Sequence, residues 1–195
     1  MYLFFDTETT GLPNDWDAPL SDTNNWPRLV QLAWSMVSKT GQTIKEKSVI
    51  IRPEGFKIPD GMIHGISNSE AIAKGQAIMP TVLEFINDVK ASSVIVAHNF
   101  SFDHSIVGCE IIRLRLEDGT DFLNRKFDWY CTMKDQRVKN FCRLPPFKYG
   151  SYKQPKLSEL YSCVIGGTFD FQHNALNDMQ ATKESFFKLR QMEIL

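Results

Sequence analysis

The sequence predicts an α/β fold built around a mixed β-sheet, and the order of its apolar segments carries this prediction. Three stretches with the character of strands come first, at residues 2–7, 28–37 and 43–52. Two shorter apolar strands, at 93–97 and 127–131, then alternate with segments of helical periodicity. Consecutive strands predict a three-stranded antiparallel meander, and strands separated by helices predict parallel pairing flanked by helices.

Length and composition are those of an ordinary globular protein. The chain has 195 residues, of which 43% are hydrophobic and 23% charged, so we expect a single domain over 1–195. A chain of this size buries about 70% of its unfolded surface, and it needs no disulfide or structural zinc to do so. The net charge of −1 gives no overall preference for nucleic acid, so such a preference has to come from local charge.

The first three strands have clear internal signals. Leu3, Phe4 and Phe5 are consecutive apolar residues, which predicts that the first strand is central and buried on both faces. The second and third strands are joined by residues 39–42, where Gly41 can adopt the positive φ of a tight turn.

Helices are predicted from apolar spacing and from end signals. Pro80 suits the first turn of a helix whose apolar residues continue to Val89. A second helix is expected over 103–116, with Ser101 as a plausible cap. Two more are expected at 157–164 and 175–192.

The cysteines and the N-terminus predict a reduced, cytoplasmic protein. The four cysteines contain no C-x-x-C pair, which favours buried thiols over a zinc site or a disulfide framework. Asp6 interrupts the apolar N-terminus, which argues against a signal peptide. The densest apolar run, 29–37, is too short to cross a membrane, so we expect no membrane partner.

Four carboxylates and one histidine are the most informative residues. Asp6 and Glu8 lie two apart on the first strand, so both side chains leave the same face of the sheet. Two like charges this close are unfavourable unless a cation lies between them. Asp103 follows the strand 93–97, where ligand groups of open α/β sheets collect, although it also suits the first turn of a helix.

The last helix adds the fourth carboxylate. Asp178 falls in its first turns, and the residues that share its helix face are small, which would let the helix approach the sheet closely. These small residues are Ala175, Ala181, Thr182 and Ser185. His173 precedes the helix on a loop, and histidine changes protonation in the neutral range, as a general base must. Carboxylate ligands of this kind select Mg²⁺ or Mn²⁺, and two such ions hydrolyse phosphodiesters.

Three motifs in this order resemble the DnaQ-like, or DEDDh, family of 3′→5′ exonucleases on the ribonuclease H-like fold. FFDTETTGL at 4–12 is similar to the first family motif, HNFSFD at 98–103 to the second, and HNALNDMQAT at 173–182 to the third. Three shorter stretches also resemble the family, at 63–67, 131–133 and 156–160.

The resemblance implies the roles of individual residues. Asp6, Glu8, Asp103 and Asp178 would hold two divalent cations, Mg²⁺ or Mn²⁺, with Asp6 bridging them. His173 would deprotonate the water that attacks the terminal phosphodiester, releasing a nucleoside 5′-monophosphate. The terminal nucleotide would be received by Thr9, Gly11, Leu12, His64, Asn99 and Phe102. His98 is expected to orient Asn99 or to touch the substrate.

Two segments depart from the common pattern. The loop 14–26 is long, acidic and rich in tryptophan, and it lies beside the expected pocket. The segment 125–156 carries nine Lys and Arg against two Asp, with seven interleaved aromatic residues. Basic and aromatic side chains together suit a nucleic-acid strand, whereas an irregular, locally packed surface would explain them equally well.

Three functions are compatible with this sequence. The first is a metal-dependent exonuclease on the 3′ end of DNA, single-stranded or overhanging, and the second is an exoribonuclease of the same class. The third is a non-catalytic nucleic-acid or polymerase-binding module, which the intact set of carboxylates argues against. Since no polymerase domain is present in the 195 residues, any proofreading role would require a partner in a larger complex.

Overall fold

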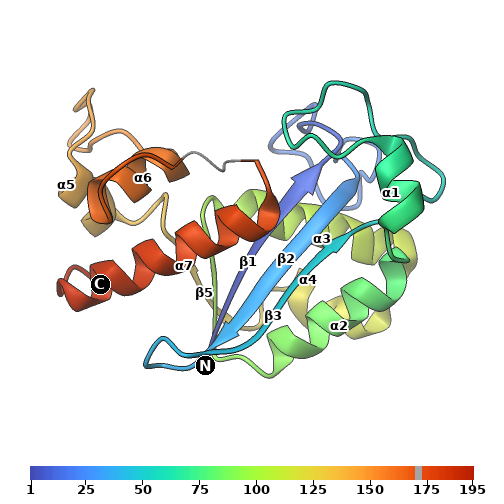
Figure 1. The fold of residues 1–195 in the computed structure, drawn as a ribbon, viewed down its shortest axis with the longest axis horizontal. Helices are drawn as coiled ribbons and strands as arrows, with labels where there is room; N and C mark the ends of the chain where they lie inside the picture. Colours follow the sequence, from blue (N-terminus) through green and yellow to red (C-terminus); the bar gives the residue numbers. More distant parts are fainter. Residues whose placement is uncertain (170–172) are drawn as a thin grey trace.

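The strand β1 (Tyr2–Thr9) lies in the middle of a five-stranded sheet of order β3-β2-β1-β4-β5. This computed structural model describes residues 1–169 and 173–195. The first three strands pair antiparallel, and β1, β4 and β5 pair parallel (Figure 1). The other strands are β2 (Leu29–Val37), β3 (Thr43–Ile50), β4 (Val94–Ala97) and β5 (Asp128–Cys131). The predicted mixed sheet is therefore confirmed, with strand bounds within two residues.

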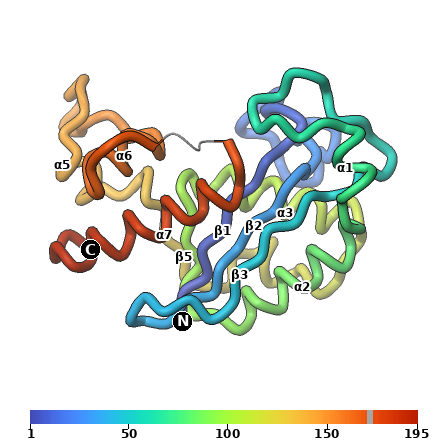
Figure 2. Tube along the Cα trace, in the orientation of Figure 1, coloured from blue at the N-terminus to red at the C-terminus, as the bar shows by residue number. Residues whose placement is uncertain are grey.

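Helices cover both faces of this sheet, as Figures 1 and 2 show. The helices are α1 (Asn68–Lys74), α2 (Ile78–Lys90), α3 (Phe100–Leu114), α4 (Thr120–Leu123), α5 (Gln136–Cys142), α6 (Leu157–Val164) and α7 (Ala175–Gln191), with a 3₁₀ turn at Glu117–Gly119. One core cluster joins α2 and α3 to one face of the sheet, and a second joins α7 to the other.

The alternation of side chains along β1 decides which layer each residue meets. Leu3 and Phe5 are fully buried in the cluster with α2 and α3, whereas Phe4 is buried in the cluster with α7. Even-numbered residues of β1 therefore face α7, and odd-numbered residues face α3. This pattern places Asp6 and Glu8 under the first turns of α7.

The predicted turn and three of the four predicted helices agree with the structure. Gly41 has φ of 93°, and Ser38 and Gln42 pair across the turn. The helix that contains Asp103, however, begins at Phe100 and not at 103. Its N-cap is Asn99, in the left-handed region at φ of 65°, so Ser101 is inside the helix and the predicted cap is wrong.

Three short helices were not predicted, namely α1, α4 and α5. Each has seven residues or fewer, so it contains too few turns for apolar periodicity to stand out. The helix α5 lies in the basic segment 125–156, which is therefore more regular than a surface loop.

All four cysteines are free thiols. Cys109 and Cys131 are buried as expected, whereas Cys142 and Cys163 are only half-buried between α5 and α6, so the expectation of buried thiols is wrong for these two. Among residues 1–169 and 173–195, no helix combines the length and the apolar character that a membrane span requires.

Candidate active site

Three of the predicted carboxylates come together on the α7 side of β1. Asp6, Glu8 and Asp178 each offer one carboxylate oxygen, and these oxygens all lie within 4.8 Å of one another. Asp6 pairs with Ala33 and Glu8 with Gln31 across the β1–β2 ladder, so the strand backbone fixes the spacing of the two acids.

The helix α7 brings Asp178 to this strand by close packing and by a defined start. The four predicted small residues are all buried, which confirms that α7 uses its small face toward the sheet; they are Ala175, Ala181, Thr182 and Ser185. The Asn174 side chain caps the helix by accepting a hydrogen bond from the backbone N–H of Leu176. The backbone N–H of Ala175 also donates to Gln31 Oε1 at 3.1 Å, which ties the start of α7 to β2.

Asp103 reaches the site from the opposite face of the sheet. It lies in the first turn of α3 and is only 2% exposed. Its Oδ1 accepts two hydrogen bonds from Thr7, from the backbone N–H at 3.1 Å and from Oγ1 at 2.7 Å. Because Thr7 lies between Asp6 and Glu8 on β1, these bonds hold the Asp103 carboxylate at the same stretch of strand.

The four carboxylates have little to compensate their charge. Among the described residues, no Lys or Arg forms an ion pair with any of them. Burial raises the pKa of Asp6 well above its usual range, with further increases from the neighbouring carboxylates. Burial likewise raises the pKa of Glu8 to about 8, that of Asp103 to about 7 and that of Asp178 to about 6.

These observations fit a divalent cation. The Oδ1 atom of Asp178 is buried and has no hydrogen-bond partner among the described residues. Buried polar atoms are almost always satisfied, so an unsatisfied carboxylate oxygen inside a cluster of acids indicates a missing positive partner. The donor set is all carboxylate, which suits Mg²⁺ or Mn²⁺.

His173 lies beside this cluster, at the entrance to α7. Its backbone N–H donates to Asp178 Oδ2 at 3.1 Å, and its φ of 66° turns the chain sharply before the helix. The residue is exposed. Its charge also contributes to lowering the pKa of His64, after the larger effect of burial. The structure thus brings His173 and the predicted pocket residue His64 to the same side.

A cavity of about 320 Å³ opens next to the carboxylates. Five of the six residues predicted to receive the terminal nucleotide line it, namely Thr9, Gly11, Leu12, His64 and Phe102. Asn99 does not line it; this residue starts α3 in the left-handed conformation. Glu8 lines the same cavity, so the pocket and the candidate metal site are continuous.

Four further wall residues of this cavity were missed, namely Thr7, Gly61, Met62 and Ile63. Ile63 is 72% exposed and Leu12 is 71% exposed. The segment 63–67 had been singled out only through its resemblance to a family stretch. An exposed apolar side chain on a loop can indicate a binding surface, but its exposure is known only from the structure and not from the sequence.

The remaining two histidines are structural. His98 shares hydrogen bonds with Thr132 Oγ1 at 2.8 Å and the carbonyl of Pro155 at 3.0 Å, so it joins the end of β4 to the basic segment. Whether it also orients Asn99 or touches substrate stays a prediction. His104 is buried, stacks on Phe100 and Phe122 and hydrogen-bonds the Phe122 carbonyl.

The basic segment 125–156 forms a second surface near the site. Lys134 Nζ donates to Ser101 Oγ at 3.2 Å, in the first turn of α3. Phe147 is 58% exposed and Tyr149 is fully exposed, and Lys148 lies between them on a turn closed by Ser151. In Figure 1, α5 and α6 lie to one side of the start of α7, and the loop after β1 lies to the other.

Comparison with known proteins places this geometry in a family. The RNase T family model, described as Exonuclease, matches residues 3–186. A curated relative, DNA polymerase III PolC-type from Listeria welshimeri serovar 6b, is 24% identical over 191 residues, which are 96% of this chain and 11% of the polymerase.

Solved structures share the fold. A product-bound exonuclease I has a TM-score of 0.73 at 17% identity, covering 99% of this chain and 44% of that one. E. coli exonuclease I in complex with a dT13 oligonucleotide has a TM-score of 0.72 at 19% identity, covering 99% and 42%. This chain therefore spans less than half of those exonucleases and about a tenth of the polymerase. Because the family match covers nearly the whole chain, the chain belongs to the DnaQ-like family of 3′→5′ exonucleases in the ribonuclease H-like superfamily.

Proposed function

We propose that this chain is a metal-dependent 3′→5′ exonuclease that hydrolyses the terminal phosphodiester bond of DNA and releases nucleoside 5′-monophosphates. The observation that carries the proposal is the cluster of four carboxylates without a cationic partner among the described residues, of which Glu8 and Asp103 are buried and Asp6 and Asp178 are half-buried. Burying like charges together costs free energy, so such a cluster is stable with its charges only when metal ions are bound.

Asp6, Glu8, Asp103 and Asp178 would hold two divalent cations. Bound there, the ions would polarise the scissile phosphate and stabilise the negative charge that develops on the attacking and leaving oxygens. The carboxylates would be ionised in that state, because a bound cation lowers the pKa values that burial raises.

His173 would act as the general base. It is exposed at the start of α7, and its backbone is fixed to the carboxylate of Asp178. In this position the imidazole can take a proton from a water molecule at the metal site and pass it to solvent. His64 is held in place by a bond from the Ile66 backbone N–H to its Nδ1 and would face the substrate from the pocket wall.

The pocket would bind the terminal nucleotide. Leu12 and Ile63 both line it and are exposed, and apolar side chains of this kind can contact a nucleobase without selecting its identity. Thr9 is held by a bond from its Oγ1 to the Gly11 carbonyl at 2.6 Å, which shapes the floor beneath Leu12.

The rest of the strand would run toward the basic segment 125–156. The nine cationic side chains there can neutralise phosphates, and exposed Phe147 and Tyr149 can stack on bases. DNA is preferred over RNA here because the relatives include a DNA polymerase and an exonuclease I solved with oligo-dT. By the same reasoning, association with a polymerase complex is proposed, and the cytoplasmic location remains a prediction.

Digestion of matched oligonucleotides tests the proposal. Single-stranded DNA and RNA of one sequence, labelled at the 5′ end, would be incubated with Mg²⁺, with Mn²⁺ or with EDTA. We expect a ladder that shortens from the 3′ end in either metal, faster for DNA, and no shortening in EDTA.

The matched variants are Asp6→Asn and the surface variant Asp60→Asn, which removes the same charge outside the site. Asp6→Asn should be inactive and Asp60→Asn should match the wild-type protein. Faster digestion of RNA would change the substrate assignment to an exoribonuclease. No shortening of either strand in any metal would contradict the catalytic proposal and favour the binding module.

A further inference from the structure

The loop 14–26 presents an aromatic side chain at the edge of the nucleotide pocket. Trp16 is 55% exposed, and its ring centroid lies 5.7 Å from that of Phe102, with the two planes inclined at 42°. Phe102 lines the pocket, whereas Trp16 does not, so Trp16 extends the aromatic surface outward from the pocket.

Trp16 is held in this place by its own loop. The Asn25 side chain, which is 8% exposed, makes two bonds to Asp15: its Oδ1 accepts from the Asp15 N–H at 2.7 Å and its Nδ2 donates to the Asp15 carbonyl at 2.8 Å. The backbone N–H of Asp17 donates in turn to Asp15 Oδ1 at 2.9 Å. Both neighbours of Trp16 in the chain are therefore tied down.

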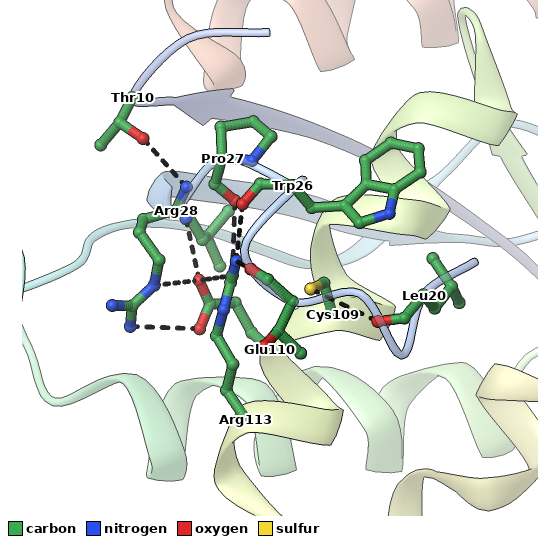
Figure 3. A network of polar contacts seen from close by, with 10 residues as sticks. Thr10, Leu20, Trp26, Pro27, Arg28, Cys109, Glu110 and Arg113 are labelled. Atoms are coloured by element: carbon green, nitrogen blue, oxygen red, sulfur yellow. Dashed lines mark hydrogen bonds and ion pairs between the residues drawn. The ribbon is translucent and has the colours of Figure 1, made fainter. Parts of the chain in front are cut away.

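The far end of the loop is anchored to α3, as Figure 3 shows. Arg113 donates to the carbonyl oxygens of Trp26 at 2.6 Å, Pro27 at 3.4 Å and Thr23. Fully buried Glu110 orients Arg113 at 2.8 Å and also binds Arg28 at 2.8 Å. An exposed tryptophan on an anchored loop loses little conformational entropy when a ligand packs on it, which favours binding.

The charge of the loop selects which part of a nucleic acid can approach it. Asp15, Asp17 and Asp22 are its ionisable residues, and no Lys or Arg occurs before Arg28. Phosphates are repelled by such a surface, whereas the face of a nucleobase carries no charge. The basic segment 125–156 attracts the phosphates instead, and through Lys134 and Ser101 it contacts the same first turn of α3 that carries Phe102.

We propose that Trp16 is a stacking residue for the nucleobase next to the terminal one, so that this site reads a second base plane outside the pocket. Asn25 is the positioning residue for Trp16. The inference rests on the proposed exonuclease function and adds a subsite to it. Aromatic stacking is tolerant of base identity but requires that a base be present.

Single abasic sites test this assignment. Wild-type protein and Trp16→Ala would be compared on single-stranded DNA that carries one abasic site at the first, second or third position from the 3′ end. We expect Trp16→Ala to lower kcat/KM about tenfold on intact DNA, the size of one stacking contact. The wild-type protein and Trp16→Ala should have equal kcat/KM only on the DNA whose second position is abasic. Equal rates on intact DNA, or a loss that persists with the second base removed, would overturn the proposal.

The controls separate this proposal from the function on which it rests. Ile44→Ala removes another exposed apolar side chain, on β3, and should leave kcat/KM unchanged. A wild-type protein that degrades no substrate would contradict the exonuclease proposal itself. Stacking can still be measured in that case, because binding of a five-nucleotide DNA in EDTA should quench tryptophan fluorescence in the wild type and less in Trp16→Phe. Equal quenching in both proteins would overturn the role of Trp16.

Discussion

The helix α3 carries two buried carboxylates, seven residues apart, with opposite surroundings. Glu110 is fully buried, and its oxygens accept from the Arg28 and Arg113 guanidinium groups and from the Leu29 backbone N–H. Asp103 is 2% exposed, and the bonds to its Oδ1 come only from neutral groups of Thr7.

The difference separates a carboxylate whose charge is balanced by arginines from one that has only neutral hydrogen-bond donors. The charge of Glu110 is balanced within the protein, so this site is complete and serves to hold the loop after β1. The charge of Asp103 adds to those of Asp6, Glu8 and Asp178, so this site lacks positive charge. Under the proposed function, this difference in charge balance is the reason why a cation would bind beside Asp103 and not beside Glu110.

The largest expected effect comes from removing the charge of Asp103. Asp103→Asn should lower kcat/KM by about 10³-fold or more, because bound metal contributes several kcal/mol to transition-state stabilisation. The same variant should keep or raise the melting temperature in EDTA, because it relieves repulsion within the cluster. Oligonucleotide digestion and thermal unfolding measure the two effects. If Asp103→Asn were destabilised and kept its kcat/KM, Asp103 would be a structural residue like Glu110, which would contradict its proposed role in catalysis.

Removing the charge of Glu110 should have the opposite outcome. Glu110→Gln leaves the half-buried guanidinium groups of Arg28 and Arg113 without a counter-charge, and breaking such a site costs about 3–5 kcal/mol of unfolding free energy. Chemical denaturation would measure the loss, with exposed Glu117→Gln as the matched control, expected within about 0.5 kcal/mol of wild type. Equal stability of Glu110→Gln and Glu117→Gln would show that the Glu110 network contributes nothing.

The stability of the metal-free protein should fall as pH rises. The folded protein raises the pKa of Asp178 to about 6, of Asp103 to about 7 and of Glu8 to about 8, above the values near 4 of an unfolded chain. Such acids bind more protons in the folded state, so stability is fully present below about pH 4 and is lost as pH rises through these values. We expect a loss on the order of a few kcal/mol between pH 5.5 and 8.5 in EDTA.

Two measurements distinguish the pH dependence caused by the carboxylate cluster from that of other acids: unfolding with added metal, and unfolding at lower pH. Mg²⁺ at about 100 times its Kd should add roughly 2.7 kcal/mol and flatten the pH profile. Glu84 has the opposite effect on stability, because the hydrogen bond from Lys47 lowers its pKa in the folded protein. The stability that Glu84 contributes is therefore lost as pH falls below about 4.5. A metal-free protein whose stability is constant from pH 5.5 to 8.5 would contradict the uncompensated cluster.

The smallest effect should come from removing one of the two hydrogen bonds that Thr7 donates to Asp103. Thr7→Val removes the Oγ1 donor but keeps the backbone N–H bond, and loss of a group that orients a metal ligand costs about 10–100-fold in affinity or activity. Thr7→Ser keeps the hydroxyl and should retain most activity. Isothermal titration with Mn²⁺ would measure the affinity, and wild-type affinity in Thr7→Val would show that the backbone bond alone suffices.

The sheet and the clustering of the carboxylates could be predicted because strong local rules apply to them. The period of two on β1 places Asp6 and Glu8 on one face, and the small residues around Asp178 predict a helix close to the sheet. The resemblance to a known family then selected His173 among four histidines. Thr7, between the two acids, gave no such signal, because its role depends on a partner 96 residues away.

The missed features depend on contacts that a sequence does not display. The helix α3 begins three residues before its predicted start because Asn99 adopts a left-handed conformation. Asn tolerates this conformation better than most residues, but its presence in a sequence does not predict it. The two hydrogen bonds of His98 could not be predicted, because its partners, Thr132 and Pro155, come from a segment with weak periodicity. The anchoring of the loop 14–26 likewise arises from Arg113, far along the chain.

The tie between Gln31 and Ala175 has a consequence for how this protein folds. It joins residues that are 144 apart in the chain. Asp178 on α7 is separated even further in the chain from Asp6 and Glu8 on β1. Contacts between such distant segments carry a large loop-closure entropy and tend to form after local ones. We therefore expect the sheet and α3 to assemble before α7 docks, so that metal affinity arises in the last step of folding. Hydrogen exchange in the first turns of α7 should then be faster without metal than with it, whereas exchange in β1 should change little.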